Sequence, residues 1–422
     1  MADDRRIGNV VTPVAAGTAA AAGALAALRS DRALEVVGAV LVALLVWMAP
    51  TRIGVVVVVV ASVAAGFQVP GAHLAPLLAW ALAVLLFARH GMLYRPKVRM
   101  FLAFVALGVI AHASTLPVTV PRGREAVVVS VVALLLAAVA VLAVSVAASP
   151  PEIVDGVLCA GGLVLAASLA LGVIVPEVAV EMGRLRGPFV NANSLGLLSA
   201  VLVAGGLTRR HRIGVLVASM AAATLVWSGS RASVTAALAA LLWIVALAVV
   251  RRRAWWIACA ASIVVAASTA IVTGLAVPDI PLFRSTNSRL AGIEYAVGSV
   301  RLEWVGGAGF ESSPVEIAST PFRWLHDGGL IALVCVLAAY ALMLAVAVGR
   351  PGPAGALLVV GFVTSLFEGW LFSGGGTMFI AFWLLYLGLI SGPESPARQR
   401  RVGVDGQALT VRSDVWLPHD AR

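Results

Sequence analysis

The sequence predicts an all-α integral membrane protein with many spans, because the chain is apolar, carries little charge and repeats apolar runs of span length. Of its 422 residues, 61% are hydrophobic and 12% are charged, and the mean hydropathy is +1.01. Soluble domains carry about 25% charged residues. Runs of this length form helices that cross a hydrocarbon core about 30 Å thick.

Fourteen apolar runs follow one another, and the shortness of three of them leaves 12–14 predicted transmembrane helices. They cover 9–28, 33–49, 53–68, 71–88, 98–115, 126–148, 153–175, 194–208, 213–228, 232–250, 254–276, 328–348, 354–373 and 376–391. The second, third and last runs are the short ones. We expect one polytopic membrane domain over 1–392, followed by a disordered cytoplasmic tail over 393–422.

Basic residues in the short connections predict the orientation of these helices. Four clusters are present: Arg89, Arg95, Lys97 and Arg99; Arg209, Arg210 and Arg212; Arg251, Arg252 and Arg253; and Arg398, Arg400 and Arg401. The preference for basic residues on the inside places these clusters and both termini in the cytoplasm, although Arg122 and Arg124 fall outside. Because the clusters account for the pI near 10.8, we do not expect nucleic-acid binding.

The same alternation places a long polar loop over 277–327 outside the cytoplasm, and we expect the chemistry there. Unpaired backbone groups cost several kcal/mol each in hydrocarbon, so this loop lies in water or at the lipid surface. It contains a predicted amphipathic interfacial helix with one apolar face, formed by Leu290, Ile293, Val297, Val300 and Trp304. The glycine-rich stretch 306–309 then predicts a turn.

Three short patterns place arginines on the predicted outer face. They read GRLRGPFVNAN over 183–193, WSGSRA over 227–232 and NSRL over 287–290. A guanidinium stays charged and binds phosphate through two parallel hydrogen bonds. Each arginine alone fits an interfacial anchor as well as a ligand-binding residue. Together, Arg186, Arg231 and Arg289 indicate a site for a lipid-linked diphosphate.

The order of these motifs, ahead of a span that opens with an acidic residue and glycine, resembles the bacterial O-antigen ligase and polymerase family over about 183–335. The resemblance implies a glycosyltransferase of polysaccharide biosynthesis at the outer side of the cytoplasmic membrane. It would move a glycan from an undecaprenyl-diphosphate carrier to an acceptor hydroxyl of the cell envelope, without metal or cofactor. Arg186, Arg231 and Arg289 would stabilise the diphosphate as leaving group, and Asn193 would shape the site.

The residue that accepts the hydroxyl proton stays open between two candidates. Many relatives carry His-Asn eleven residues before the glycine of the next span, whereas this chain has Ala318-Ser319 there, counted back from Gly329. Glu316 lies closer to the expected position, and His326 is also near in sequence. Either side chain accepts a proton if it is aimed at the hydroxyl. His326 also fits an interfacial helix start.

Other residues give weaker indications. Trp304, Trp324 and Phe322 are candidates for stacking on sugar rings, although aromatic residues are common at interfaces in any case. The loop has no paired aspartates of the kind that hold a metal with a nucleotide sugar, which favours a lipid-linked donor. Three cysteines are widely spaced in apolar runs, so neither a disulfide framework nor a zinc site is expected.

Two other classes of function remain open from the sequence. A transporter or flippase of a lipid-linked saccharide would have polar or broken helices near the membrane midplane and repeat symmetry. The chain has few charges there, no convincing repeat, and most of its polarity on one face. A scaffold of an envelope assembly is the third class, and it leaves the clustered outer arginines unexplained.

Overall fold

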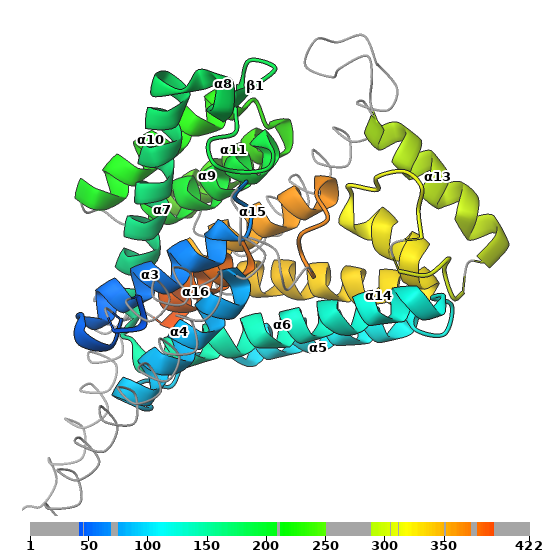
Figure 1. The fold of residues 1–422 in the computed structure, drawn as a ribbon, viewed down its shortest axis with the longest axis horizontal. Helices are drawn as coiled ribbons and strands as arrows, with labels where there is room; N and C mark the ends of the chain where they lie inside the picture. The colour runs from blue at the N-terminus through cyan, green and yellow to red at the C-terminus, as the bar shows by residue number, and fades with distance from the viewer. Residues whose placement is uncertain are drawn as a thin grey trace, which may run out of the picture.

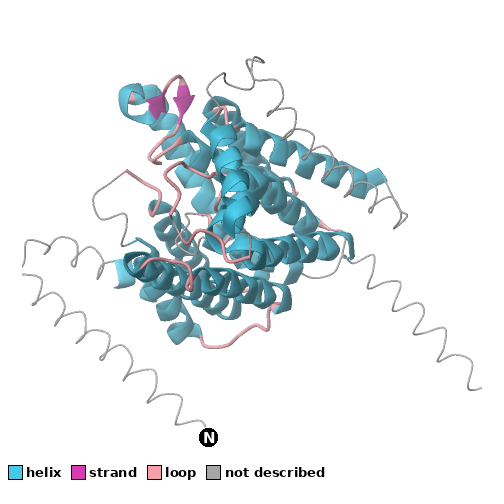
Figure 2. Ribbon diagram, turned by 90° about the vertical axis from the view of Figure 1, so that its right-hand side faces the viewer, coloured by secondary structure: helices cyan, strands magenta, loops and turns pink. Residues whose placement is uncertain are grey.

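The computed structural model describes residues 42–44, 46–68, 75–208, 212–249, 288–303, 305–310, 312–349, 352–372 and 378–391. Its regular secondary structure is helical apart from one short hairpin (Figures 1 and 2), which confirms the predicted all-α class. The helices are α3 (Thr51–Ala64), α4 (Ala75–His90), α5 (Arg99–Thr115), α6 (Pro121–Ala147), α7 (Pro150–Ile174), α8 (Pro176–Ala179), α9 (Ala192–Leu207), α10 (Arg212–Ser228), α11 (Arg231–Val249), α13 (Ser288–Glu303), α14 (Thr320–Gly349), α15 (Pro353–Phe367) and α16 (Phe379–Ser391). The predicted runs 9–28 and 254–276, most of 33–49, and the tail 393–422 lie outside the described residues.

Within these residues, three helices are long and apolar enough to cross a membrane. They are Gly123–Ala147 of α6, Pro150–Ile174 and Thr320–Gly349. The other apolar helices have 13–19 residues, from α16 to α11, shorter than the about 20 residues of an upright span. The number of spans therefore stays a prediction.

Capping residues fix where two helices begin. Glu152 Oε2 accepts hydrogen bonds from the Ser149 amide at 2.8 Å and the Ser149 hydroxyl at 2.6 Å at the start of α7. Asn191 Oδ1 accepts the Ser194 amide at 2.9 Å at the start of α9. The first turn of a helix leaves backbone amides without partners inside the helix. In both arrangements a side-chain oxygen accepts a hydrogen bond from an amide at the helix start.

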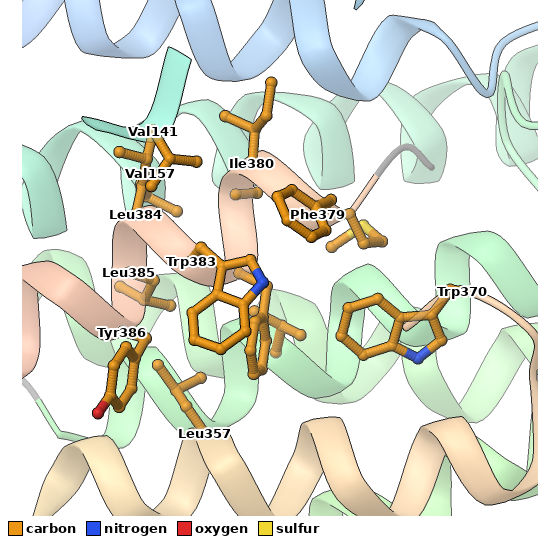
Figure 3. Packing of buried hydrophobic residues seen from close by; sticks show 14 of the residues in the cluster. Val141, Val157, Leu357, Trp370, Phe379, Ile380, Trp383, Leu384, Leu385 and Tyr386 are labelled. Carbon is orange, nitrogen blue, oxygen red and sulfur yellow. The ribbon is translucent and has the colours of Figure 1, made fainter. Parts of the chain in front are cut away.

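Helix α16 lies at the centre of the bundle. Every residue from Met378 to Leu387 is buried, and α16 contacts α6, α7, α15 and α3. Figure 3 shows Trp383 with Val141 of α6, Val157 of α7 and Leu357 of α15, and its ring centroid lies 4.7 Å from that of Phe104 on α5. A helix that is apolar on every side fits either a protein interior or a membrane span, and the burial of these residues places α16 in the interior. The predicted last span is therefore an internal helix.

Helix α14 runs beside α5 and is broken near its start (Figure 1). Gly329 has φ 64° and ψ −151°, and divides α14 into a short helix over 320–328 and a long one over 330–349. The loop was expected to continue to Asp327. The structure shows that the last part of this loop is the short helix: the chain is helical from Thr320, and Arg323 reaches Asp327 one turn later, 3.6 Å from Nε to Oδ2.

The two parts of α14 fold back toward each other. On the short helix, Thr320 Oγ1 donates to the Glu368 carbonyl at 2.6 Å, just after the end of α15. On the long helix, the Tyr340 hydroxyl accepts a hydrogen bond from Ser365 of α15 at 3.0 Å. Both parts thus meet the same end of α15, and α14 forms a V with Gly329 at its apex.

The predicted glycine turn caps the short helix. The amides of Ala308 and Gly309 donate to the carbonyls of His326 at 2.7 Å and Asp327 at 3.0 Å. These carbonyls have no partner within the helix because it ends there. Gly307 and Gly329 both have positive φ, and a Cβ on either would approach the backbone of the other closer than 3.0 Å. The turn and the helix break therefore require glycine on both sides.

The connections gather at two ends of the bundle. At one end, which we name the loop end, the Gln68 amide donates to the Pro188 carbonyl at 2.8 Å, and the Phe310 amide donates to Thr119 Oγ1 at 3.0 Å. At the other, the basic end, the Lys97 amide donates to Ser391 Oγ at 3.4 Å. This grouping is the one that the predicted alternation of spans requires.

Candidate functional site

A short hairpin at the loop end positions the first arginine group. Strands β1 (Val180–Glu181) and β2 (Arg184–Leu185) pair antiparallel. The two residues between them, Met182 and Gly183, have φ of 49° and 74°, which matches the two-residue turns that suit tight hairpins. The hairpin places Arg184 against the connections that begin α9 and α11.

Arg184 joins the hairpin to the start of α9 and to the end of α10, which lies 44 residues further along the chain. Its Nε donates to the Ser228 carbonyl, and its Nη2 donates to Asn193 Oδ1, each at 2.7 Å. Asn193 therefore belongs to the arginine group, bound by Arg184. Sequence reasoning chose Arg186 from the R-L-R pattern and missed Arg184. The available signal was that two arginines flank Leu185, which is buried, so both point away from the core on the same side of the strand.

The guanidinium of Arg186 contacts neutral acceptors. Its Nε donates to the Val178 carbonyl at 3.1 Å, and its Nη1 donates to the side-chain oxygen of Gln68. No carboxylate of the described residues lies within ion-pair distance of it. The positive charge of Arg186 is thus held at the loop end without a described counter-charge.

Arg231 begins α11 at the turn that Arg184 contacts. Gly229 in this turn has φ 57°, and Arg231 is half-buried. Helices α11 and α15 pack together, and a Cβ on Gly355 would touch the Trp243 ring. Arg231 lies twelve residues before Trp243, and Phe367 lies twelve residues after Gly355. Since the two helices run in opposite directions, Arg231 lies level with the end of α15.

The second group is a buried histidine with an adjacent carboxylate at the apex of the V. His326 Nδ1 lies 2.9 Å from Asp327 Oδ1, and the imidazole is 0% exposed. Within the described part of the chain, His326 Nε2 and Asp327 Oδ2 have no hydrogen-bond partner. A carboxylate at one ring nitrogen fixes the ring and leaves the other nitrogen to accept a proton.

An aromatic ring from α13 covers this histidine. The ring centroids of Tyr295 and His326 lie 5.4 Å apart at an interplanar angle of 42°. The predicted helix of the loop is present as α13, but small residues form its protein-facing side: Gly292 and Ala296 are buried, whereas Val297 of the predicted apolar face is exposed. A Cβ on Gly292 would approach the Glu316 carbonyl closer than 3.0 Å, so α13 sits directly on the chain before the short helix.

The remaining predicted site residues lie in different surroundings. Trp324 is 4% exposed and packs edge-on against the His112 ring, with centroids 4.7 Å apart, so it is part of the core here. Glu316 is exposed on the extended segment ahead of α14. Arg289 lies in the first turn of α13, and its side chain lies outside the described set.

The two groups occupy separate places at the loop end. Figure 1 shows α8 and β1 apart from α13, with the C-terminal end of α15 between them in this view. Among the described residues, no three His, Cys, Asp or Glu side chains gather as a metal site would require. The chain matches no family model, and no curated protein is significantly similar to it.

Proposed function

We propose that the protein is a multi-pass glycosyltransferase of the cytoplasmic membrane, with its loop end outside the cytoplasm. It transfers a glycan from an undecaprenyl-diphosphate carrier to a hydroxyl of an envelope acceptor, as a ligase or polymerase. The observation that carries this proposal is the His326–Asp327 pair, oriented and buried at the same end of the bundle as the arginine group. The reaction needs both a proton acceptor and cationic stabilisation of a diphosphate.

In this proposal His326 is the general base. Its Nε2 accepts the proton of the acceptor hydroxyl, while Asp327 holds Nδ1 and stabilises the imidazolium that forms. The hydroxyl oxygen attacks the anomeric carbon with inversion and forms the new glycosidic bond. The bond from that carbon to the diphosphate breaks, and its electron pair stays on the diphosphate oxygen. Arg186, Arg231 and Arg289 stabilise that negative charge.

The surroundings of the two candidate bases favour His326 over Glu316. Glu316 is exposed, and no described hydrogen bond orients its carboxylate. His326 is fixed by Asp327 at 2.9 Å, and its second nitrogen is unoccupied within the described residues. A base that is held in place loses less freedom at the moment of reaction.

The alternative function is a transporter or flippase of a lipid-linked saccharide. One observation favours it: α14 is broken at Gly329, and broken helices form the substrate sites of many transporters. The buried His-Asp pair has no evident use in moving an intact lipid, so the transferase explains more of the loop end.

A deletion strain and reconstituted protein separate the two functions. For a transferase, the strain accumulates glycan-linked undecaprenyl diphosphate on the outer leaflet and loses one surface polymer. Purified protein in liposomes with that precursor and an acceptor glycan then forms new glycosidic bonds. Precursor trapped on the inner leaflet, together with transport but no bond formation in liposomes, would overturn the transferase in favour of the flippase.

A further inference from the structure

The connection between α4 and α5 at the basic end presents three consecutive apolar side chains to the outside. Met92, Leu93 and Tyr94 are 66%, 60% and 39% exposed. The backbone is fixed there, because the amides of Leu93 and Tyr94 both donate to the Val146 carbonyl at 2.9 Å. Apolar and aromatic residues held outward at the end of a span are typical of contact with the membrane interface.

A cavity of about 80 Å³ opens beside these three residues. Its wall comes from four segments and includes Tyr94, Arg95, Ser145, Ile153, Leu387 and Ser391. This volume is several times larger than the space of about 10–15 Å³ that one water molecule needs. Its lining combines residues that carry hydroxyl groups or a guanidinium with apolar residues. Such a mixture suits a polar group that carries an apolar tail.

The charges around this cavity favour an anion. Arg95 lines it, Lys97 follows in the same connection, and Arg99 begins α5. In the described part of the chain no carboxylate pairs with Arg95, and the nearby Glu152 is already bonded to Ser149. Burial, followed by the charge of Arg89, lowers the pKa of His90. The positive charge of this end therefore rests on arginine and lysine at neutral pH.

We propose that this cavity binds the phosphate headgroup of an anionic phospholipid from the leaflet at the basic end. Arg95 pairs with the phosphate, and the hydroxyls of Tyr94 and Ser391 lie at the same cavity to hydrogen-bond its oxygens. Met92 and Leu93 lie next to the acyl chains. The exposed apolar residues beside the cavity favour a lipid over a free anion. The site lies at the opposite end from the proposed transferase centre and does not depend on that function.

The test uses the full-length protein purified in a neutral detergent and titrated with phosphatidylglycerol or phosphatidylcholine. The readouts are the number of retained phospholipids by native mass spectrometry and the midpoint of thermal unfolding. We expect saturable binding of phosphatidylglycerol but not of phosphatidylcholine. Arg95→Gln raises the half-saturating concentration about tenfold or more, since the direct hydrogen bonds between the guanidinium and the phosphate are lost and each such bond contributes about 1.5–3 kcal/mol. Arg99→Gln, with the same charge change outside the cavity, leaves it unchanged.

Other outcomes would contradict the proposal. Equal effects of Arg95→Gln and Arg99→Gln would show only general attraction by basic charge. The same stabilisation by inorganic phosphate alone would identify a site for a soluble anion. A rise in lipid binding after removal of residues 392–422 would identify the chain's own tail as the occupant. If Arg95→Gln does not fold, Arg95→Lys takes its place, because it keeps the charge without the bidentate geometry. We expect it to raise the half-saturating concentration about twofold to fivefold, which is less than the expected effect of Arg95→Gln.

Discussion

The imidazole of His326 and the carboxylate of Asp327 lie 2.9 Å apart at the break in α14. Both residues belong to the helical stretch that ends at Gly329, the residue of α14 with a non-helical backbone. The pair and the backbone break thus form one structural unit.

Removing either member of the pair should abolish most transfer. We expect His326→Gln and Asp327→Asn to lower the initial rate in proteoliposomes by about 10²-fold or more, the usual contribution of a general base. Glu316→Gln is the matched control and should keep near-normal activity. Loss of activity in the Glu316 variant with retention in the His326 variant would reverse the assignment.

Removing the ring of Tyr295 should expose His326. Tyr295→Ala is expected to raise the rate at which diethylpyrocarbonate modifies His326 severalfold, measured by mass spectrometry of the modified peptide. His112 serves as an internal reference, because both its ring nitrogens have hydrogen-bond partners in the core. Glu294→Ala on an exposed position of the same helix is the control. An unchanged rate at His326 would mean that Tyr295 does not cover it in solution.

Arg184 and Arg186 should differ in what they stabilise. Arg184→Ala removes hydrogen bonds to the Ser228 carbonyl and Asn193, each worth about 1.5–3 kcal/mol for a charged donor. It should lower the unfolding midpoint in detergent. The hydrogen bonds of Arg186 are more exposed to solvent, so Arg186→Ala should lower the midpoint less and raise the KM for the lipid-linked donor. The reverse pattern would exchange their assigned roles.

Arg289 carries a prediction from the sequence motif. Arg289→Ala and Arg289→Lys should both abolish transfer, because a lysine cannot reproduce the bidentate contact with phosphate. Membrane insertion and the unfolding midpoint should match those of the unsubstituted protein. Transfer that survives in the alanine variant would remove Arg289 from the diphosphate site.

The glycines at the helix break should tolerate no side chain. Gly307→Ala and Gly329→Ala combine a positive φ with backbone overlap, and the backbone conformation alone costs about 1–3 kcal/mol. Both should lower the unfolding midpoint. Gly298→Ala in α13 meets nothing within 4 Å, and helix propensity favours alanine there by up to about 1 kcal/mol. Equal midpoints for all three variants would contradict the role of the turn.

The sequence predicts the local features of this fold better than the contacts between distant segments. The helices, the glycine turn before α14 and the helix of the polar loop follow from hydropathy, composition and periodicity. The burial of α16 does not, because lipid tails are as apolar as leucine and an apolar run does not distinguish a lipid-facing helix from an internal one. The contact of Arg184 with Ser228 also depends on packing between distant segments.

The site residues show the same division. Sequence motifs indicated arginines and a nearby histidine or glutamate, but not which base is oriented. His326 and its partner Asp327 lie at the end of the short helix, and the turn around Gly307 contacts that end. A break of this kind depends on backbone contact between two glycine-containing segments, which no single stretch of sequence reveals.

The central position of α16 sets an order for assembly during biosynthesis. This helix is the last one described in the chain, yet it fills the space among α6, α7 and α15. The ribosome therefore delivers the surrounding helices before the piece that they enclose. Until translation passes Ser391, the helices around this position lack the side chains of α16 that pack among them. The native packing of the bundle therefore forms only after α16 has been synthesised.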